Sequence, residues 1–196
     1  MPDLPTKTAI AEAPDDHKPL RSYATLVAGC EFVSRYPVMI EQGSSNRSTA
    51  LEIKVHMRVT ANRIRELDRF LAVMLDEAAG RIGGAGHDAE QFDRISNTSK
   101  KLRAVEMSVG MAAADHGRLR ALGRIAARLR GPSHHWRARS LRVDMELVGA
   151  EGCANIDSRS GKASRSLPLN LSTISSFYYD LGRRLSEELS NKNYSP

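Results

Sequence analysis

Apolar residues recur every three or four positions from Asn62 to about residue 82. The series includes Ile64, Leu67, Leu71 and Met74, which that spacing places on a single stripe of a helix. Asn62 suits the position just before a first helical turn, and the glycines after residue 82 disfavour any continuation. The pattern predicts a long helix over 62–82.

Helical spacing also appears in four other segments, which are 20–36, 88–112, 116–130 and 172–190. Pro37 disfavours helix at the residue before it, and Gly131 with Pro132 supplies a stop after Arg130. Aromatic residues make up only 5% of the chain, so the core is mostly aliphatic, which favours packed helices. Whether residues 88–130 form one helix or two stays open.

Two segments show a different period. Apolar and polar residues alternate over 51–59 and again over 141–147, as in half-buried strands. The charges on their polar faces are complementary in a parallel and in an antiparallel register, so the direction of pairing stays open. The expected fold is therefore α+β and helix-dominated, with about four to five helices and a small two-stranded β element. An all-α fold is the alternative.

Composition divides the chain. Residues 1–19 are rich in proline and lack apolar periodicity, which predicts a disordered tail. A single globular domain is expected over 20–190, with a basic Ser/Gly-rich loop at 149–170 and a flexible end at 191–196. Cys30 and Cys153 have no zinc-like spacing, and no apolar run approaches the ~20 residues of a membrane span. A cytoplasmic, bacterial-type protein without a membrane span is the expectation.

Positive charge is concentrated in one stretch. The net charge is +6, and no Asp or Glu lies between Asp115 and Asp144, whereas eight arginines do: Arg118, Arg120, Arg124, Arg128, Arg130, Arg137, Arg139 and Arg142. On a helix, Arg120, Arg124 and Arg128 form one basic ridge whose like charges repel. The ridge calls for a compensating anion, which is either phosphate or the protein's own acidic surface, for instance Asp76, Glu77, Glu90 or Asp93. Solvation by water is the third alternative.

The same stretch resembles, over about 17 residues, the helix-turn-helix of bacterial transcription regulators. The resemblance lies in Ile125-Ala-Ala-Arg-Leu129, a Gly-Pro-Ser turn, and His134-His-Trp-Arg-Ala-Arg-Ser-Leu141. In that motif a basic second helix enters the major groove of DNA. The turn here is one residue longer than usual, and Pro132 is atypical within it. The resemblance implies that Arg137 and Arg139 face nucleic acid. Trp136, beside these basic residues, either stacks on a base or is a core anchor.

A second resemblance points to catalysis. The Arg-x4-His spacing of Arg130 and His135 resembles the catalytic pair of HEPN-type ribonucleases, in which Arg stabilises phosphate and His does acid–base chemistry. In that family the motif lies on a helix, which Gly131 and Pro132 would break. His116, His134 and His135 have no Cys or carboxylate at ligand spacing, so neither a metal nor a cofactor is predicted.

The functional expectation is therefore binding rather than catalysis. The chain is expected to be a nucleic-acid-binding regulatory protein, contacting DNA or RNA through residues 116–142. The predicted contact residues are Arg120, Arg124, Arg128, Arg137, Arg139 and Trp136. A helical adaptor that docks an acidic protein is the alternative, and a HEPN-like ribonuclease is a remote one. No oligomeric state is predicted.

Overall fold

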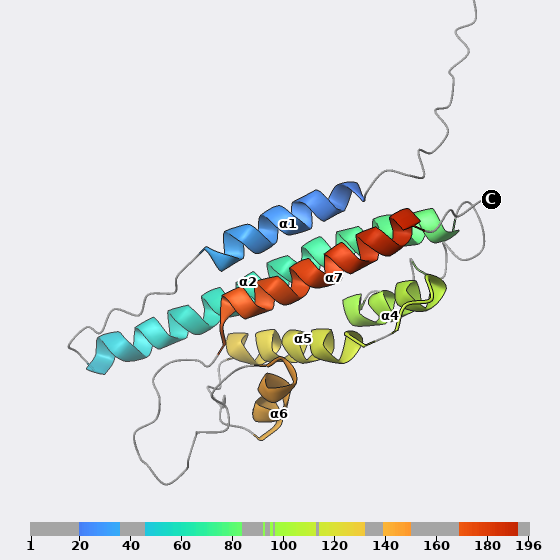
Figure 1. The fold of residues 1–196 in the computed structure, drawn as a ribbon. Coiled ribbons are helices and arrows are strands. Elements are labelled where there is room, and N and C mark those ends of the chain that lie inside the picture. The colour runs from blue at the N-terminus through green and yellow to red at the C-terminus, as the bar shows by residue number, and fades with distance from the viewer. Residues whose placement is uncertain are drawn as a thin grey trace, which may run out of the picture.

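The computed structural model describes residues 20–35, 46–83, 92, 95, 97–112, 114–131, 139–149 and 169–191. These residues contain six α-helices and no strand (Figure 1). In chain order the helices are α1 (Arg21–Ser34), α2 (Asn46–Gly83), α4 (Thr98–Ser108), α5 (His116–Arg130), α6 (Arg139–Leu147) and α7 (Leu171–Asn191). The helix-dominated character expected from the sequence is confirmed.

Helix α2 is the centre of the arrangement. It is 38 residues long and packs against α1, α4, α5 and α7. Its inward face is one continuous apolar stripe at helical spacing, made of Met57, Ala61, Ile64, Leu67, Leu71, Met74, Leu75 and Ala78. The helix predicted over 62–82 is therefore present, but it begins sixteen residues earlier, at Asn46.

The first predicted strand is wrong, because residues 51–59 belong to α2. Their alternation does not correspond to two faces: Leu51 and Val55 are 64% and 53% exposed, whereas Met57 is buried. Met57 and Ala61 continue the stripe of Ile64 upstream at helical spacing. The helical period of this stripe, rather than the alternation, determines the structure of 51–59. It lets the segment bury Met57 on the side of α2 that packs against neighbouring helices.

The second predicted strand is also wrong, because residues 141–147 lie in α6. Leu141 and Met145 of α6 and Val148 just after it are buried, whereas Val143 and Leu147 are more than half exposed. Burial thus follows the helical period and not the alternation. With both strands absent, the described residues fit the all-α alternative and not the α+β fold.

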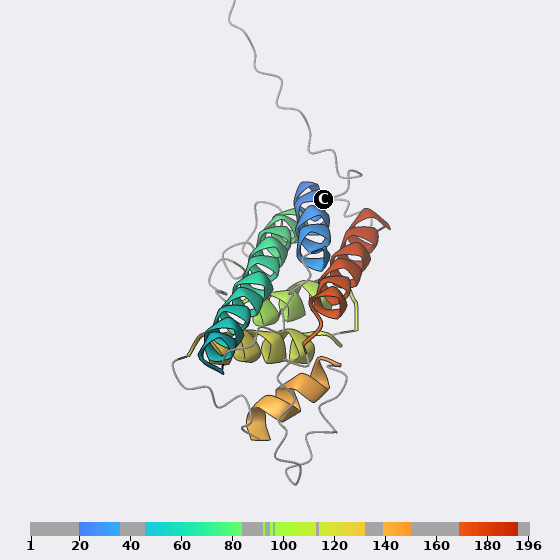
Figure 2. The same ribbon diagram turned by 90° about the vertical axis from the view of Figure 1, so that its left-hand side faces the viewer.

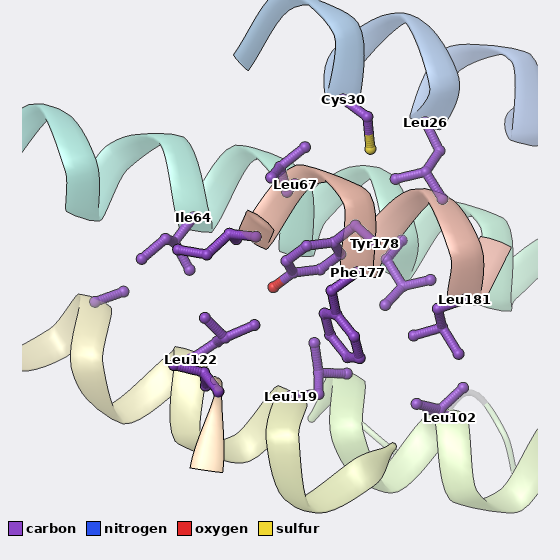
Figure 3. Packing of buried hydrophobic residues seen from close by; sticks show 14 of the residues in the cluster. Leu26, Cys30, Ile64, Leu67, Leu102, Leu119, Leu122, Phe177, Tyr178 and Leu181 are labelled. Atoms are coloured by element: carbon purple, nitrogen blue, oxygen red, sulfur yellow. The ribbon is translucent and has the colours of Figure 1, made fainter. Parts of the chain in front are cut away.

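The helices form successive layers (Figures 1 and 2). Helix α1 packs on α2 and α7, α4 and α5 lie on the other side of α2, and α6 runs across the outer side of α5. The layers meet in one aliphatic core (Figure 3) with two aromatic members from α7, Phe177 and Tyr178. Helix α1 and helix α5 therefore occupy opposite sides of the bundle.

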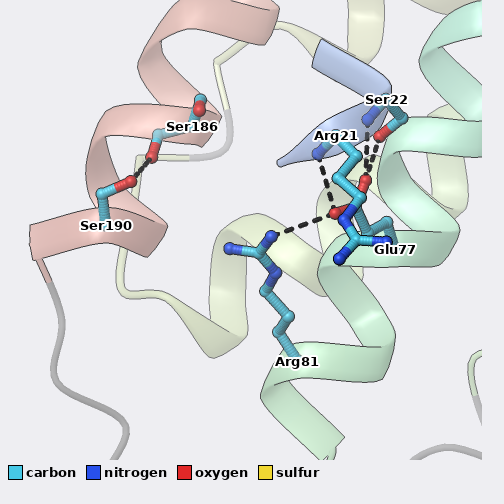
Figure 4. A network of polar contacts seen from close by, with 6 residues as sticks. All are labelled: Arg21, Ser22, Glu77, Arg81, Ser186 and Ser190. Atoms are coloured by element: carbon cyan, nitrogen blue, oxygen red, sulfur yellow. Dashed lines mark hydrogen bonds and ion pairs between the residues drawn. The ribbon is translucent and has the colours of Figure 1, made fainter. Parts of the chain in front are cut away.

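Side chains from one helix fix the ends of others. The start of α1 is capped by Glu77 of α2, whose carboxylate accepts the backbone N–H groups of Arg21 and Ser22 at 2.9 Å each (Figure 4). Arg81 donates to the same carboxylate at 3.0 Å. Burial acts to raise the pKa of Glu77, but these hydrogen bonds and the Arg81 charge outweigh it and hold the pKa below its usual range.

A break separates α4 from α5, so the described part of residues 88–130 holds two helices. Helix α4 ends at Ser108, and Gly110 follows with a φ of 69°, a left-handed conformation that glycine adopts without strain. Helix α5 spans His116–Arg130, which confirms the predicted segment. Asp115 stands before α5 but makes no side-chain cap and instead pairs with Arg184 of α7.

The predicted tail at 1–19 lies outside the described residues, as does almost all of the loop expected at 149–170. Asn191 is the last residue of α7, and 192–196 again lie outside. The expectation of a single domain over 20–190 stays a prediction.

Candidate functional site

Helix α5 has a buried side and a basic side. Leu119, Leu122, Ile125, Ala126 and Leu129 are buried, and the helix packs mainly on α2. The remaining positions that are exposed hold only arginine or a very small residue: Arg120, Gly123, Arg124, Ala127 and Arg130. Because no acid and no large apolar side chain is present on this exposed face, it carries positive charge and little else. We refer to these five residues as the basic face.

Arg124 is held by a carboxylate from α6. Its Nε donates to both oxygens of Asp144, at 3.0 and 3.1 Å, and Arg128 Nη1 lies 3.5 Å from the same group. The Asp144 side chain is only 5% exposed, whereas those of Arg124 and Arg128 are 44% and 38% exposed. The carboxylate is thus covered, whereas both arginine side chains remain more than a third exposed, although Arg128 Nη1 itself is buried.

Arg118 is used inside the protein. Its guanidinium carbon lies 4.4 Å from the centroid of the Phe177 ring, within the range of a cation–π contact. Its Nη2 donates to the backbone carbonyl of Val148 at 2.9 Å, just after the end of α6. Arg118 therefore joins α5 to α6 and α7.

Arg120 and Arg130 differ from the other arginines of α5. Both are exposed, and neither forms an ion pair or hydrogen bond with any other described residue. Their positive charges are neutralised by nothing within the described part of the chain. They are the arginines of this helix that are most available to an external anion.

A cleft of about 420 Å³ opens beside the basic face. One wall is Arg120, Gly123 and Arg124 of α5, and the other is Asp68 of α2 with the start of α4 at Asn97. Thr98 donates to one carboxylate oxygen of Asp68 at 2.9 Å. Burial raises the pKa of Asp68, and the Thr98 hydrogen bond acts against that rise. The cleft therefore has a carboxylate on one wall and two guanidinium groups on the other.

The structure brings together three of the six predicted contact residues, Arg120, Arg124 and Arg128, on one helix as expected. Arg139 is the first residue of α6, and only its backbone is described. Arg137 and Trp136 lie outside the described residues. That these six side chains contact nucleic acid stays a prediction.

Of the four acids expected as compensation, the two that the structure describes, Asp76 and Glu77, do not pair with the arginine ridge. Asp76 pairs with Lys101, Glu77 caps α1, and Glu90 and Asp93 lie outside the described residues. Asp144 takes this place instead. It is the first acid after the acid-free stretch, but its contact with Arg124 depends on the way α6 crosses α5, which no local spacing encodes.

The two family resemblances depend largely on residues 132–138, which lie outside the described part of the chain. Helix α5 ends at Arg130, and Gly131 has an extended backbone with a ψ of 155°, whereas His135 lies outside the described residues. Helix α6 follows α5 and crosses it, as the second helix of a helix-turn-helix does. Its described exposed residues are Val143, Glu146 and Leu147, and the side chains of its two arginines, Arg139 and Arg142, lie outside the described part of the structure.

Within the described residues, no group of three or more His, Cys, Asp or Glu side chains is placed to hold a metal ion. None of the described helices is both long enough and apolar enough to cross a bilayer. Comparison of the chain with known protein families, with curated proteins and with solved structures found no match. The chemistry of the site itself is therefore the basis for a functional interpretation.

Proposed function

We propose that the protein binds nucleic acid through its phosphate backbone, with the basic face of α5 as the main contact surface. The observation that carries the proposal is the composition of this face, in which Arg120, Arg124 and Arg130 are exposed and only Gly123 and Ala127 lie between them. Guanidinium groups form two parallel hydrogen bonds with phosphate, and they suit this task better than lysine does. The predicted residues Arg137, Arg139 and Trp136 are part of the proposal as an extension of this surface.

The composition of the face favours nucleic acid over an acidic protein partner. Stable protein interfaces are centred on buried aromatic or aliphatic anchors surrounded by polar residues. The basic face contains no such anchor. Binding to a polyanion needs none, because released counterions supply most of the affinity. A protein partner is therefore the weaker alternative.

Arg120 and Arg130 are the appropriate residues to change. Reversing the charge of Arg124 or Arg128 would place a carboxylate beside the buried Asp144 and disturb the docking of α6. Arg120 and Arg130 are exposed and pair with no other described residue. The double variant Arg120→Glu with Arg130→Glu therefore tests binding without removing a structural contact.

A matched control has the same charge change on other helices. Arg35 is exposed at the end of α1, and Arg183 is exposed on α7. Their partners, Glu31 and Glu187, are exposed as well, and such surface pairs contribute at most about 1 kcal/mol. The variant Arg35→Glu with Arg183→Glu thus has the same net charge as the test variant.

The measurement is fluorescence anisotropy with labelled DNA and RNA, single-stranded and duplex, at salt concentrations from ~50 to ~200 mM. We expect binding that weakens with salt, and a loss of at least ~10-fold in the test variant against under ~2-fold in the control. No binding of any probe at ~50 mM salt, where phosphate contacts are strongest, overturns the proposal. Equal losses in both variants would show that net charge alone is responsible.

A further inference from the structure

The cleft beside the basic face offers unused hydrogen-bonding groups on both walls. On the α2 and α4 side, Asp68 uses one carboxylate oxygen to accept from Thr98, and its other oxygen accepts from no described residue. The carbonyl oxygen of the Asn97 side chain caps α4 by accepting from Ser99 N at 3.1 Å, which leaves the amide NH₂ group free to donate. One wall thus presents an acceptor and a donor.

The opposite wall presents positive charge. Arg120 has no partner among the described residues, and Arg124 is fixed by Asp144 through Nε and Nη2, so its Nη1 carries no hydrogen bond to a described residue. Asp144 therefore orients Arg124 without using all of its donors. Between these side chains the cleft is lined by Gly123 and Ala127, which leave its volume open.

The two walls together select a class of ligand. A simple anion would be repelled by Asp68, and a simple cation would be repelled by Arg120 and Arg124. A ligand that fits both walls has an anionic group at one end and N–H donors at the other. A nucleotide has this chemistry, since its phosphate is anionic and the edges of several bases carry N–H groups that donate to a carboxylate.

We propose that this cleft takes one unpaired nucleotide of a single strand, with its phosphate on Arg120 and Arg124 and its base edge on Asp68 and Asn97. The inference rests on the proposed function and specifies its substrate as single-stranded nucleic acid. A cleft of about 420 Å³ lies within the range of roughly 300–1,000 Å³ that small-molecule sites occupy. A paired base cannot enter it, because its Watson–Crick edge is already used.

The test compares single strands with blunt duplexes of the same length for wild-type protein and for variants that fill the cleft. Gly123→Leu adds a side chain at a position where an added Cβ would have no atom within 4 Å, so the helix accommodates it. Ala127→Leu, at a second exposed position of the cleft, is an independent variant of the same kind. Gly117→Leu is the matched control, because Gly117 is on α5, has the same free space and does not line the cleft.

We expect wild-type protein and the Gly117→Leu control to bind single strands at least ~10-fold more tightly than duplexes. In Gly123→Leu and Ala127→Leu this ratio should fall below ~2-fold, because the single strand loses the cleft that the duplex never enters. Asp68→Asn should change which of four homopolymer strands binds best, because a carboxylate only accepts hydrogen bonds from a base edge, whereas an amide also donates them.

Equal affinity for single strands and duplexes in the wild-type protein, with both cleft-filling variants unchanged, overturns the inference and leaves backbone binding by α5 intact. Absence of binding to either probe at ~50 mM salt means that the proposed function itself fails. An acidic peptide that binds as tightly as a single strand of equal charge also overturns the inference, because a peptide has no base for Asp68 and Asn97.

Discussion

Arg124 and Asp144 join α5 to α6 through a carboxylate that is almost completely covered and a guanidinium that is not. The Asp144 side chain is 5% exposed, and that of Arg124 is 44% exposed. The two partners therefore contribute unequally: the arginine can be solvated when it is alone, whereas the aspartate cannot. The loss of stability in the docking of α6 on α5 should therefore depend on which of the two partners is removed.

Replacing both arginines should cost more than replacing the aspartate. Arg124→Gln with Arg128→Gln leaves a buried carboxylate without a countercharge, which destabilises the docking of α6 by about 3 kcal/mol. Asp144→Asn leaves two arginine side chains that are each more than a third exposed, with a loss of about 1 kcal/mol. Hydrogen exchange of the backbone amides of 139–147 measures the loss directly.

The triple variant that combines all three changes is the control. It has no buried charge at position 144, so its α6 amides should be better protected than those of the double arginine variant. If the α6 amides exchanged at equal rates in the double and triple variants, an uncompensated Asp144 charge could not be the cause of the lost protection.

The helices of this fold were predictable wherever an apolar stripe extends over several turns. The segment His116–Arg130 was predicted with its correct ends, because apolar residues at helical spacing fill it and a glycine and a proline follow it. Residues 51–59 and 141–147 were wrongly predicted as strands, because seven to nine alternating positions are too few to exclude a helix. For 51–59, Leu51 and Val55 are exposed in the described structure, so their apolar character was misleading.

The candidate site was predictable in part for the same reason. The ridge of Arg120, Arg124 and Arg128 follows from helical spacing alone. The role of Asp144 does not, because it depends on contacts between two helices. The cleft was missed altogether, since Asp68 and Arg120 come from helices far apart in sequence and only packing brings them together.

Glu106 should make stability depend on pH near neutrality. The residue is fully buried, and neither carboxylate oxygen has a hydrogen-bond partner among the described residues. Burial, aided by the nearby Asp115 charge and opposed by Arg184, raises the pKa of Glu106 from 4.5 to about 7. The folded protein thus keeps a proton that the unfolded chain releases. The free energy of unfolding therefore falls as the pH rises from the pKa of the unfolded chain, 4.5, to the pKa of the folded protein, about 7.

The size of this fall should be about 3 kcal/mol, since one pKa unit corresponds to roughly 1.4 kcal/mol. Urea denaturation at several pH values between about 5 and 8.5 measures it. Glu106→Gln carries no titrating group, so it should be more stable than the wild type at high pH and show a flatter pH dependence. A wild-type profile that rises over this pH range would contradict the prediction.

Removing the hydroxyl of Tyr178 should leave stability unchanged or raise it. Tyr178 has no exposed surface, its oxygen has no hydrogen-bond partner among the described residues, and it points toward Ile64 and Leu122 (Figure 3). Tyr178→Phe keeps the ring and removes an unsatisfied polar group, which is worth up to about 1 kcal/mol. Thermal unfolding of the variant checks this, and a lower Tm would show that the hydroxyl is satisfied elsewhere.

The close approach of α1 to α7 depends on Gly182. A Cβ at this position would lie 2.5 Å from Leu26 Cδ2, and Leu26 has no exposed surface into which it can move. Gly182→Ala should therefore lower the free energy of unfolding by about 1–3 kcal/mol, in spite of the better helix propensity of alanine. Urea denaturation of this variant measures the change.

Gly80→Ala is the matched substitution, because Gly80 is an exposed residue of α2 with no atom within 4 Å of an added Cβ. Here the helix propensity of alanine acts alone, so stability should rise by about 0.5–1 kcal/mol. The two variants make the same chemical change on two helices and should move stability in opposite directions. If Gly182→Ala stabilised the protein as Gly80→Ala does, α1 would have to lie farther from α7 than the contact with Leu26 requires.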